Sequence, residues 1–224
     1  MSAVHSASRH VNTVVFDLGG VLIDWDPRYL YRRLMPEDEV DDFLDEIGFA
    51  EWNRGQDAGG SWAEAVAAHA ALHPRRRELI EAYPQRFADT LGDAIAGTVA
   101  ILDELHAAGV PLLALTNWSG ETFQVAHRTY PFLDLFDGIV VSGEEQVAKP
   151  DPRIFSVLLA RYGLVAADTV FIDDSPANVT AARAAGLVTI HFESPARLRE
   201  QLVESGVLPP ATGAVSPPPE AEPA

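Results

Sequence analysis

The feature that most constrains the fold is a β-branched, apolar run that ends abruptly in an acid. Residues 11–18 read VNTVVFDL, so the run closes at Asp17. A short continuous run of this kind is typical of a buried strand in a parallel sheet, which is covered on both faces. Similar apolar runs return later in the chain, and they predict four more strands at residues 110–117, 136–142, 169–174 and 186–192.

Helical segments alternate with these strands, and this alternation predicts an α/β fold with a mainly parallel sheet. The helices are expected at residues 96–108, 119–130, 151–162, 176–185 and 195–205. In such sheets, ligands bind beyond the carboxyl ends of the strands. The polar residues at those ends are Asp17, Thr116, Asn117, Asp173, Asp174 and His191.

One block interrupts the alternation. Residues 28–90 read as helices without a clear strand and follow the first strand directly. We interpret residues 25–90 as a helical cap inserted into a core of residues 11–24 and 91–206. Trp52 and Trp62 are expected to be buried in the cap or at its interface with the core. The termini, residues 1–10 and 208–224, are expected to be flexible, because the second is rich in Pro, Ala and Glu.

Composition excludes several classes of function. The 224 residues carry a formal net charge of −17, which repels nucleic acid and anionic membranes. No apolar run approaches the roughly 18 residues that a membrane span needs. The absence of cysteine excludes a thiol nucleophile and fits a cytoplasmic protein without proving it. Lys149 is the only lysine of the chain. The sequence does not indicate an oligomeric state.

Four segments together carry a resemblance to a known family. They are VVFDLGGVLID (14–24), LLALTNWS (112–119), VAKPDPRIF (147–155) and VFIDDSPANVTAA (170–182). Their order and spacing resemble the haloacid dehalogenase superfamily over residues 11–206. The resemblance implies a Rossmann-like core, a helical cap between the first two motifs and hydrolase activity.

The residues agree with the phosphoryl chemistry that the resemblance implies. Asp17 ends a strand before a Gly-Gly turn, and such a carboxylate can attack phosphorus to form an aspartyl-phosphate. With Asp173 and Asp174 it makes an oxygen-rich cluster that suits Mg²⁺. The alternative for the acid pair is capping of the helix that starts at Ser175. The resemblance adds the backbone carbonyl of Gly19 as a metal ligand.

The remaining site residues are assigned by the resemblance and by position. The Thr116 hydroxyl donates to a phosphoryl oxygen, and the charge of Lys149 offsets the negative charge that builds up in the site. Asn117 assists in phosphate binding at the start of a helix, and Asn178 orients the metal site. The cap and hinge offer Trp25, Trp52, Asn53 and Arg54 as candidates for substrate binding.

The sequence departs from the family pattern at one position. Most phosphatases of the family carry an acid–base Asp two residues after the nucleophile, where this chain has Gly19. Asp24 and Asp26 are candidate replacements, although both also fit turn and hinge roles. Glycine at position 19 also fits a turn that needs a positive φ.

Three functions therefore remain open. The first is Mg²⁺-dependent hydrolysis of small phosphorylated metabolites, phosphomonoesters that include sugar phosphates. The second is a 2-haloacid dehalogenase, which uses the same aspartate on carbon without a metal. The third is a catalytically weak binding or regulatory protein that has kept the pocket.

Overall fold

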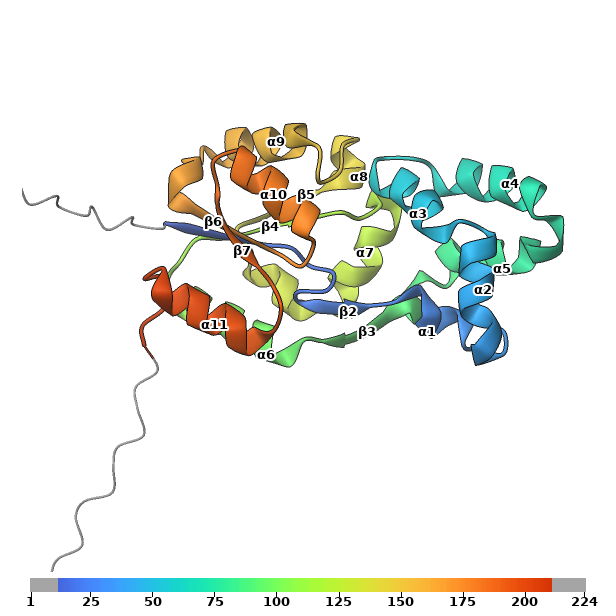
Figure 1. Ribbon diagram of the computed structural model, residues 1–224, viewed down its shortest axis with the longest axis horizontal. Coiled ribbons are helices and arrows are strands. Elements are labelled where there is room, and N and C mark those ends of the chain that lie inside the picture. Colours follow the sequence, from blue (N-terminus) through green and yellow to red (C-terminus); the bar gives the residue numbers. More distant parts are fainter. Residues whose placement is uncertain (1–11, 211–224) are drawn as a thin grey trace, which may run out of the picture.

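A five-stranded parallel sheet lies between two layers of helices (Figure 1), and the computed structural model describes residues 12–210 of the chain. The strand order is β5-β4-β1-β6-β7. In that order the strands are Gly138–Val141, Leu112–Thr116, Thr13–Phe16, Thr169–Asp173 and Val188–His191. Each neighbouring pair runs parallel, which confirms the predicted α/β fold.

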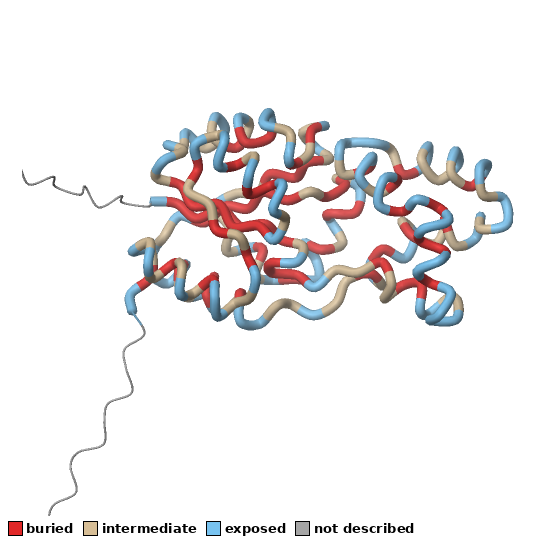
Figure 2. The backbone as a smooth tube through the Cα atoms, in the orientation of Figure 1, coloured by how far each residue is buried: buried red, intermediate tan, exposed pale blue. Residues whose placement is uncertain are grey.

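Side chains alternate between the two faces of this sheet, as the pleat of a strand requires. Val14 and Phe16 join one apolar cluster, whereas Val15 joins the other. The first face is covered by α6 (Ala96–Ala107), α7 (Gly120–Thr129) and α11 (Pro195–Glu204). The second face is covered by α9 (Pro152–Tyr162) and α10 (Pro176–Ala184). Helices therefore cover both faces of the sheet, and Figure 2 shows its three central strands as buried.

All five helices predicted for this part of the chain are confirmed, but three short elements were not predicted. A two-stranded antiparallel sheet pairs β2 (Ile23–Trp25) with β3 (Leu91–Ala94). A short helix, α8 (Ser142–Glu145), follows β5 directly. Elements of three or four residues are too short to show a hydrophobic period, so the sequence carries little signal for them.

The chain between β2 and β3 forms helices, and we call residues 27–90 the helical insert. Its helices are α1 (Pro27–Tyr31), α2 (Val40–Glu46), α3 (Phe49–Asp57), α4 (Trp62–Leu72) and α5 (Arg77–Gln85). No strand forms in residues 27–90, which the structure describes throughout. The division of the molecule into separate core and cap domains stays a prediction.

Aromatic side chains fill the helical insert and join it to the rest of the molecule. The ring centroids of Trp52 and Trp62 lie 5.0 Å apart, and those of Trp62 and Tyr83 lie 5.2 Å apart. Both tryptophans are buried, as predicted. Phe87 lies near the end of the insert, and its ring centroid is 5.7 Å from that of Trp118, which follows β4 in the chain. The insert is therefore packed against the edge of the sheet.

The packed part of the chain extends slightly further than expected. Leu208 is buried, and its amide donates to the carbonyl of Leu202 at 3.1 Å. The chain is therefore packed as far as Leu208, which joins the apolar cluster of α11, and the flexible tail predicted for residues 208–224 stays a prediction. The expected flexibility of residues 1–10 and 211–224 concerns segments outside the described residues. Within residues 12–210, no helix is long and apolar enough to cross a membrane.

Candidate active site

Three carboxylates meet where β1 and β6 end. These strands are neighbours, and the Asp17 amide donates to the carbonyl of Ile172 at 2.8 Å. Carboxylate oxygens of Asp17, Asp173 and Asp174 all lie within 4.8 Å of one another. Three clustered anions repel one another unless a cation lies between them. Hard oxygen donors of this kind are the ligands that Mg²⁺ prefers, so the residues present fit that ion.

The side chain of Lys149 links two of these acids. Its Nζ lies 2.9 Å from Asp17 Oδ1 and 2.7 Å from Asp173 Oδ2. The same Nζ donates to the Leu115 carbonyl at 2.9 Å. These three acceptors match the three protons of an ammonium group. The only lysine of the chain is therefore buried in the acid cluster.

Burial and the charges of neighbouring groups both shift the pKa values of Lys149 and Asp17. Burial lowers the pKa of Lys149, but Asp17 and Asp173 outweigh it, so the pKa is raised and the ammonium stays charged. Burial raises the pKa of Asp17 well above its ordinary value of 3.8; Lys149 opposes this rise, and Asp173 adds to it. Ionised Asp17 is therefore favoured by any further positive charge that binds beside it.

Asp173 and Asp174 differ in their surroundings. Asp173 is fully buried, and its Oδ1 accepts from the Ser175 amide at 2.8 Å. Asn178 Nδ2 donates to both of its oxygens, at 3.0 and 3.1 Å. Asp174 is more exposed, and burial, with Asp173, raises its pKa. The Asp173 carboxylate thus also bonds the start of α10, the alternative that the sequence left open.

Asn117 holds Lys149 in place through two hydrogen bonds. Its Nδ2 donates to the Lys149 carbonyl and its Oδ1 accepts from the Lys149 amide, both at 2.8 Å. The side chain predicted to bind phosphate is thus already paired with the backbone of another site residue. Thr116, the last residue of β4, is buried at the same edge of the sheet.

The Gly-Gly turn after Asp17 needs its second glycine rather than its first. Gly20 has φ +74°, and a Cβ there would lie 2.4 Å from Asp174 Oδ2. Gly19 is outside the positive-φ region, and a Cβ there would meet no atom within 4 Å. The suggestion that Gly19 serves a positive φ is therefore wrong. The turn has room for a side chain at that position.

A pocket lies between the sheet edge and the helical insert, and we call it the insert pocket. Five of its lining side chains are aromatic: Trp25, Trp62, Tyr83, Phe87 and Trp118. The others are Gly19, Asn53, Asp57, Asn117 and Thr122. The buried indole N–H groups of Trp62 and Trp118 have no hydrogen-bond partner within residues 12–210. The pocket thus combines aromatic walls with a few polar groups, and it reaches Gly19, two residues after Asp17, although no residue of the acid cluster lines it.

Asp57 is the carboxylic acid that lines the insert pocket, and the sequence does not predict it as a site residue. It is the last residue of α3, and Asn53 Nδ2 donates to its Oδ2 at 3.0 Å. Burial raises its pKa to about 7, against opposing effects of Lys149 and the Ser119 backbone. No motif marks it, and its only sequence signal is its place before the Gly59-Gly60 turn.

Of the cap and hinge residues proposed from the sequence, four do not line the insert pocket: Trp52, Arg54, Asp24 and Asp26. Arg54 is paired with Glu51 and lines a neighbouring depression together with Trp25, Asn53 and Asn117. Asp24 Oδ2 accepts from the Tyr29 hydroxyl at 2.6 Å, and Asp26 Oδ1 accepts from the Arg28 amide at 2.8 Å as the cap of α1.

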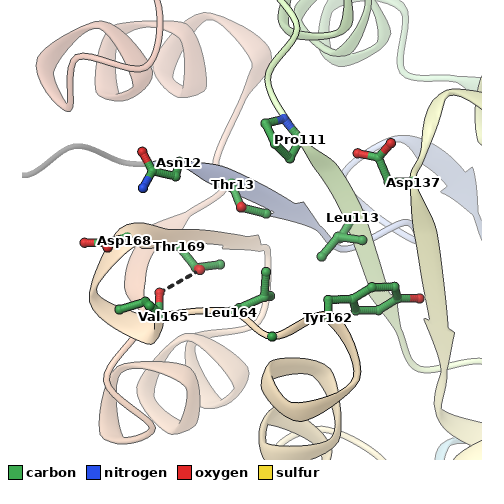
Figure 3. A pocket seen from close by; sticks show the side chains of 11 residues that line it. Asn12, Thr13, Pro111, Leu113, Asp137, Tyr162, Leu164, Val165, Asp168 and Thr169 are labelled. Atoms are coloured by element: carbon green, nitrogen blue, oxygen red, sulfur yellow. Dashed lines mark hydrogen bonds between the residues drawn. The ribbon is translucent and has the colours of Figure 1, made fainter.

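A second pocket, of about 410 Å³, opens at the other end of the sheet (Figure 3). It lies by Thr13 and Thr169, where β1 and β6 begin. Its acids are Asp137 and Asp168, and no Lys, Arg or His is among its lining residues within residues 12–210. The chemistry-bearing side chains therefore gather at the carboxyl edge, as expected for this type of sheet.

Comparisons with known proteins identify the family of this chain. The chain is 28% identical over 178 residues to sesquiterpene phosphatase astK of Aspergillus oryzae, covering 80% of this chain and 88% of the relative. It is 27% identical over 197 residues to a phosphoglycolate phosphatase of Caulobacter vibrioides, covering 84% and 80%. The fold matches that of the HAD family enzyme BT-2542 of Bacteroides thetaiotaomicron, whose structure was solved in complex with magnesium and inorganic phosphate. The TM-score is 0.64 at 23% identity, and the match covers 82% of this chain and 95% of the other. The family model for haloacid dehalogenase-like hydrolases matches residues 11–186, so the chain belongs to this hydrolase family.

Proposed function

We propose that this protein is a Mg²⁺-dependent hydrolase of small phosphomonoesters that works through an aspartyl-phosphate on Asp17. The observation that carries the proposal is the cluster of Asp17, Asp173 and Asp174, with Lys149 bonded to the first two. The phosphatase names of its relatives support the same reaction class. Sugar phosphates remain within the proposed substrate range.

The proposed metal ligands are Asp17, Asp174, Asp173 and the backbone carbonyl of Gly19. Asp173 already accepts from Lys149, Ser175 and Asn178, so Asp17 and Asp174 are the acids with the greater capacity left for a cation. When bound, Mg²⁺ supplies positive charge that offsets the repulsion between the Asp17 carboxylate and a phosphoryl group.

The protein's own residues divide the reaction into two steps. The Asp17 carboxylate attacks phosphorus while the bond from phosphorus to the leaving oxygen breaks, and water then hydrolyses the acyl phosphate. The Leu18 amide, at 2.7 Å, and Lys149 both donate to Asp17 Oδ1 and so orient the nucleophile. Lys149 and Thr116 stabilise the charge that develops on the phosphoryl oxygens.

Dehalogenation is the second candidate. A structure described as a dehalogenase matches the fold with TM-score 0.64 at 19% identity. Displacement at carbon by the Asp17 carboxylate needs no metal, whereas Asp173 and Asp174 add two carboxylates within 4.8 Å of Asp17 that could hold a cation. The acid pair therefore favours the metal-dependent reaction.

One assay separates the two candidates. Purified protein is given p-nitrophenyl phosphate or L-2-chloropropionate, each with chelator and then with added Mg²⁺. We expect phosphate release that the chelator abolishes and Mg²⁺ restores, with Asp17→Asn inactive under all conditions. Phosphate release that persists in chelator, or chloride release without metal, would contradict the proposal.

A further inference from the structure

The proposed reaction needs a proton donor that position 19 does not supply. The leaving oxygen of an alkyl phosphate is a poor leaving group unless it is protonated, and the water of the second step must lose a proton. Gly19 has no side chain, and Asp24 and Asp26 lie outside the insert pocket. We propose that Asp57, contributed by the helical insert, is the general acid and base of this reaction; this inference rests on the proposed function.

The position of Asp57 is the first support. Among the described residues that line the insert pocket, Asp57 is the only carboxylic acid, and it shares that pocket with Gly19 and Asn117. Its backbone carbonyl accepts from Ser142 Oγ at 2.5 Å. Ser142 is fully buried at the start of α8, directly after β5. This bond fixes the end of α3 to the same sheet that carries the acid cluster.

The carboxyl group of Asp57 is also held in orientation. Asn53, one helical turn earlier, donates to Asp57 Oδ2 at 3.0 Å. The Tyr83 hydroxyl in turn donates to Asn53 Oδ1 at 3.2 Å. All three residues line the insert pocket. A chain of hydrogen bonds that supports a titratable group from behind is typical of a positioned acid or base.

The groups around Asp57 tune its affinity for a proton. Burial raises its pKa to about 7, while the charge of Lys149 and the Ser119 backbone lower it. Tyr83 faces it in neutral form, because burial raises the pKa of that phenol well above 10.0. An acid with a pKa near neutrality is populated in both protonation states, as a group that first donates and then accepts a proton must be.

The two steps conserve protons with water as the only co-reactant. As Asp17 bonds to phosphorus, the leaving oxygen takes the proton of Asp57 and departs as an alcohol, which leaves Asp57 as a carboxylate. Water then attacks the aspartyl-phosphate and gives its proton to Asp57. The bond from phosphorus to the Asp17 oxygen breaks, inorganic phosphate leaves, and both acids return to their starting forms.

The Asp57→Asn variant tests this assignment because it keeps the size of the side chain and loses the proton. With an alkyl phosphate we expect its turnover to fall about 10²–10⁴-fold, the range typical of acid–base catalysis. With p-nitrophenyl phosphate the leaving group needs no proton, so the first step should persist. Phosphorylated enzyme should then accumulate, seen as a burst and by intact-mass spectrometry. Asp24→Asn is the matched control and should behave as wild type.

A second variant introduces a proton-donating side chain at another position of the site. Gly19→Asp, added to Asp57→Asn, should recover turnover of alkyl phosphates, because the backbone at position 19 leaves open space for a side chain. In addition, wild-type rates should depend only weakly on the pKa of the leaving group. This measurement needs no variant and holds even if Asp57→Asn fails to fold.

The outcomes separate this proposal from the proposed function. Mg²⁺-dependent wild-type activity together with unchanged alkyl phosphate turnover in Asp57→Asn would overturn the role of Asp57 alone. That role would also be overturned by an equal loss on all substrates without phosphorylated enzyme, or by a steep leaving-group dependence in the wild type. A wild type without activity on any phosphate ester would overturn both proposals.

Discussion

Lys149 and Asp173 form an ion pair that is closed off from solvent: Nζ lies 2.7 Å from Oδ2, and neither side chain has any exposed surface. Such a pair is stable only if the remaining polar atoms find partners. Asp173 receives further hydrogen bonds from Ser175 and Asn178, and Lys149 also bonds Asp17 and the Leu115 carbonyl. The pair is therefore fully bonded, and one ammonium group holds the acid cluster together.

Replacing Lys149 by methionine should impair both activity and stability. We expect activity to fall about 10²–10³-fold, the effect of losing one preorganised charge contact. Two buried carboxylates would lose their cation, which typically costs about 3–5 kcal/mol of the free energy of unfolding. Steady-state kinetics and urea unfolding measure the two effects. The control is Arg153→Met, which removes a largely exposed ion pair with Asp151. Near-wild-type activity in a folded Lys149→Met variant would refute the role of the Lys149 charge.

Stability should depend on pH through Asp57. Its pKa is about 7 in the folded protein and its ordinary value is 3.8, so between these values the folded state binds more protons than the unfolded state. The free energy of unfolding should then fall as pH rises from about 4 to about 7, by at most about 1.4 kcal/mol per pH unit.

Asp57→Asn removes this titration and supplies the measurement. Denaturant unfolding at a series of pH values, without metal, should show the variant gaining stability relative to wild type up to about pH 7 and levelling off above it. Asp42→Asn, at an exposed position in α2, is the matched control. A stability difference that stays constant across this range would mean that folding leaves the pKa of Asp57 unchanged.

The sheet and its acid cluster could be predicted because both produce local sequence patterns. Each buried strand is a continuous apolar run, and Asp17 and Asp173 stand where two such runs end. Parallel strands place their carboxyl ends at one edge, so strand pairing brings the two acids together. Lys149 stood out for a different reason, since it is the only lysine of the chain.

The features that the sequence did not predict depend on tertiary packing. Asp57 reaches the pocket because Ser142 anchors the end of α3, a contact across 85 residues. Asn117 bonds to the Lys149 backbone across 32 residues, which no local pattern indicates. Likewise, "GG" alone does not tell which glycine has the positive φ. Each of these needs the docked positions of distant segments.

The Gly-Gly turn offers a matched pair of variants. Gly20→Ala places a Cβ at φ +74° and within 2.4 Å of Asp174 Oδ2, so it should strain the backbone by about 1–2 kcal/mol and displace that carboxylate. Gly19→Ala meets open space and should be nearly neutral. Calorimetric Mg²⁺ titration should show weaker binding for Gly20→Ala only. Equal binding by both variants would argue against Asp174 as a ligand.

The last prediction concerns the aromatic wall of the insert pocket. The buried indole N–H of Trp118 has no partner within residues 12–210, and an unpaired buried donor typically costs about 1–3 kcal/mol. We expect a hydroxyl or another acceptor on the leaving group to recover that cost if it reaches this N–H on binding.

Trp118→Phe removes the N–H and keeps an aromatic ring against Phe87. We expect the free protein to be at least as stable as wild type and KM for a sugar or polyol phosphate to rise. The rise should be about 2–10-fold, the loss of one hydrogen bond, with no change for phenyl phosphate. The control is Trp52→Phe, because the Trp52 indole already donates to the Ala65 carbonyl at 3.3 Å. This variant should lose stability without changing the ratio of the KM values for the two substrates. Equal effects of Trp118→Phe on both substrates would show that the Trp118 ring acts by shape alone and that its N–H recognises nothing in the leaving group.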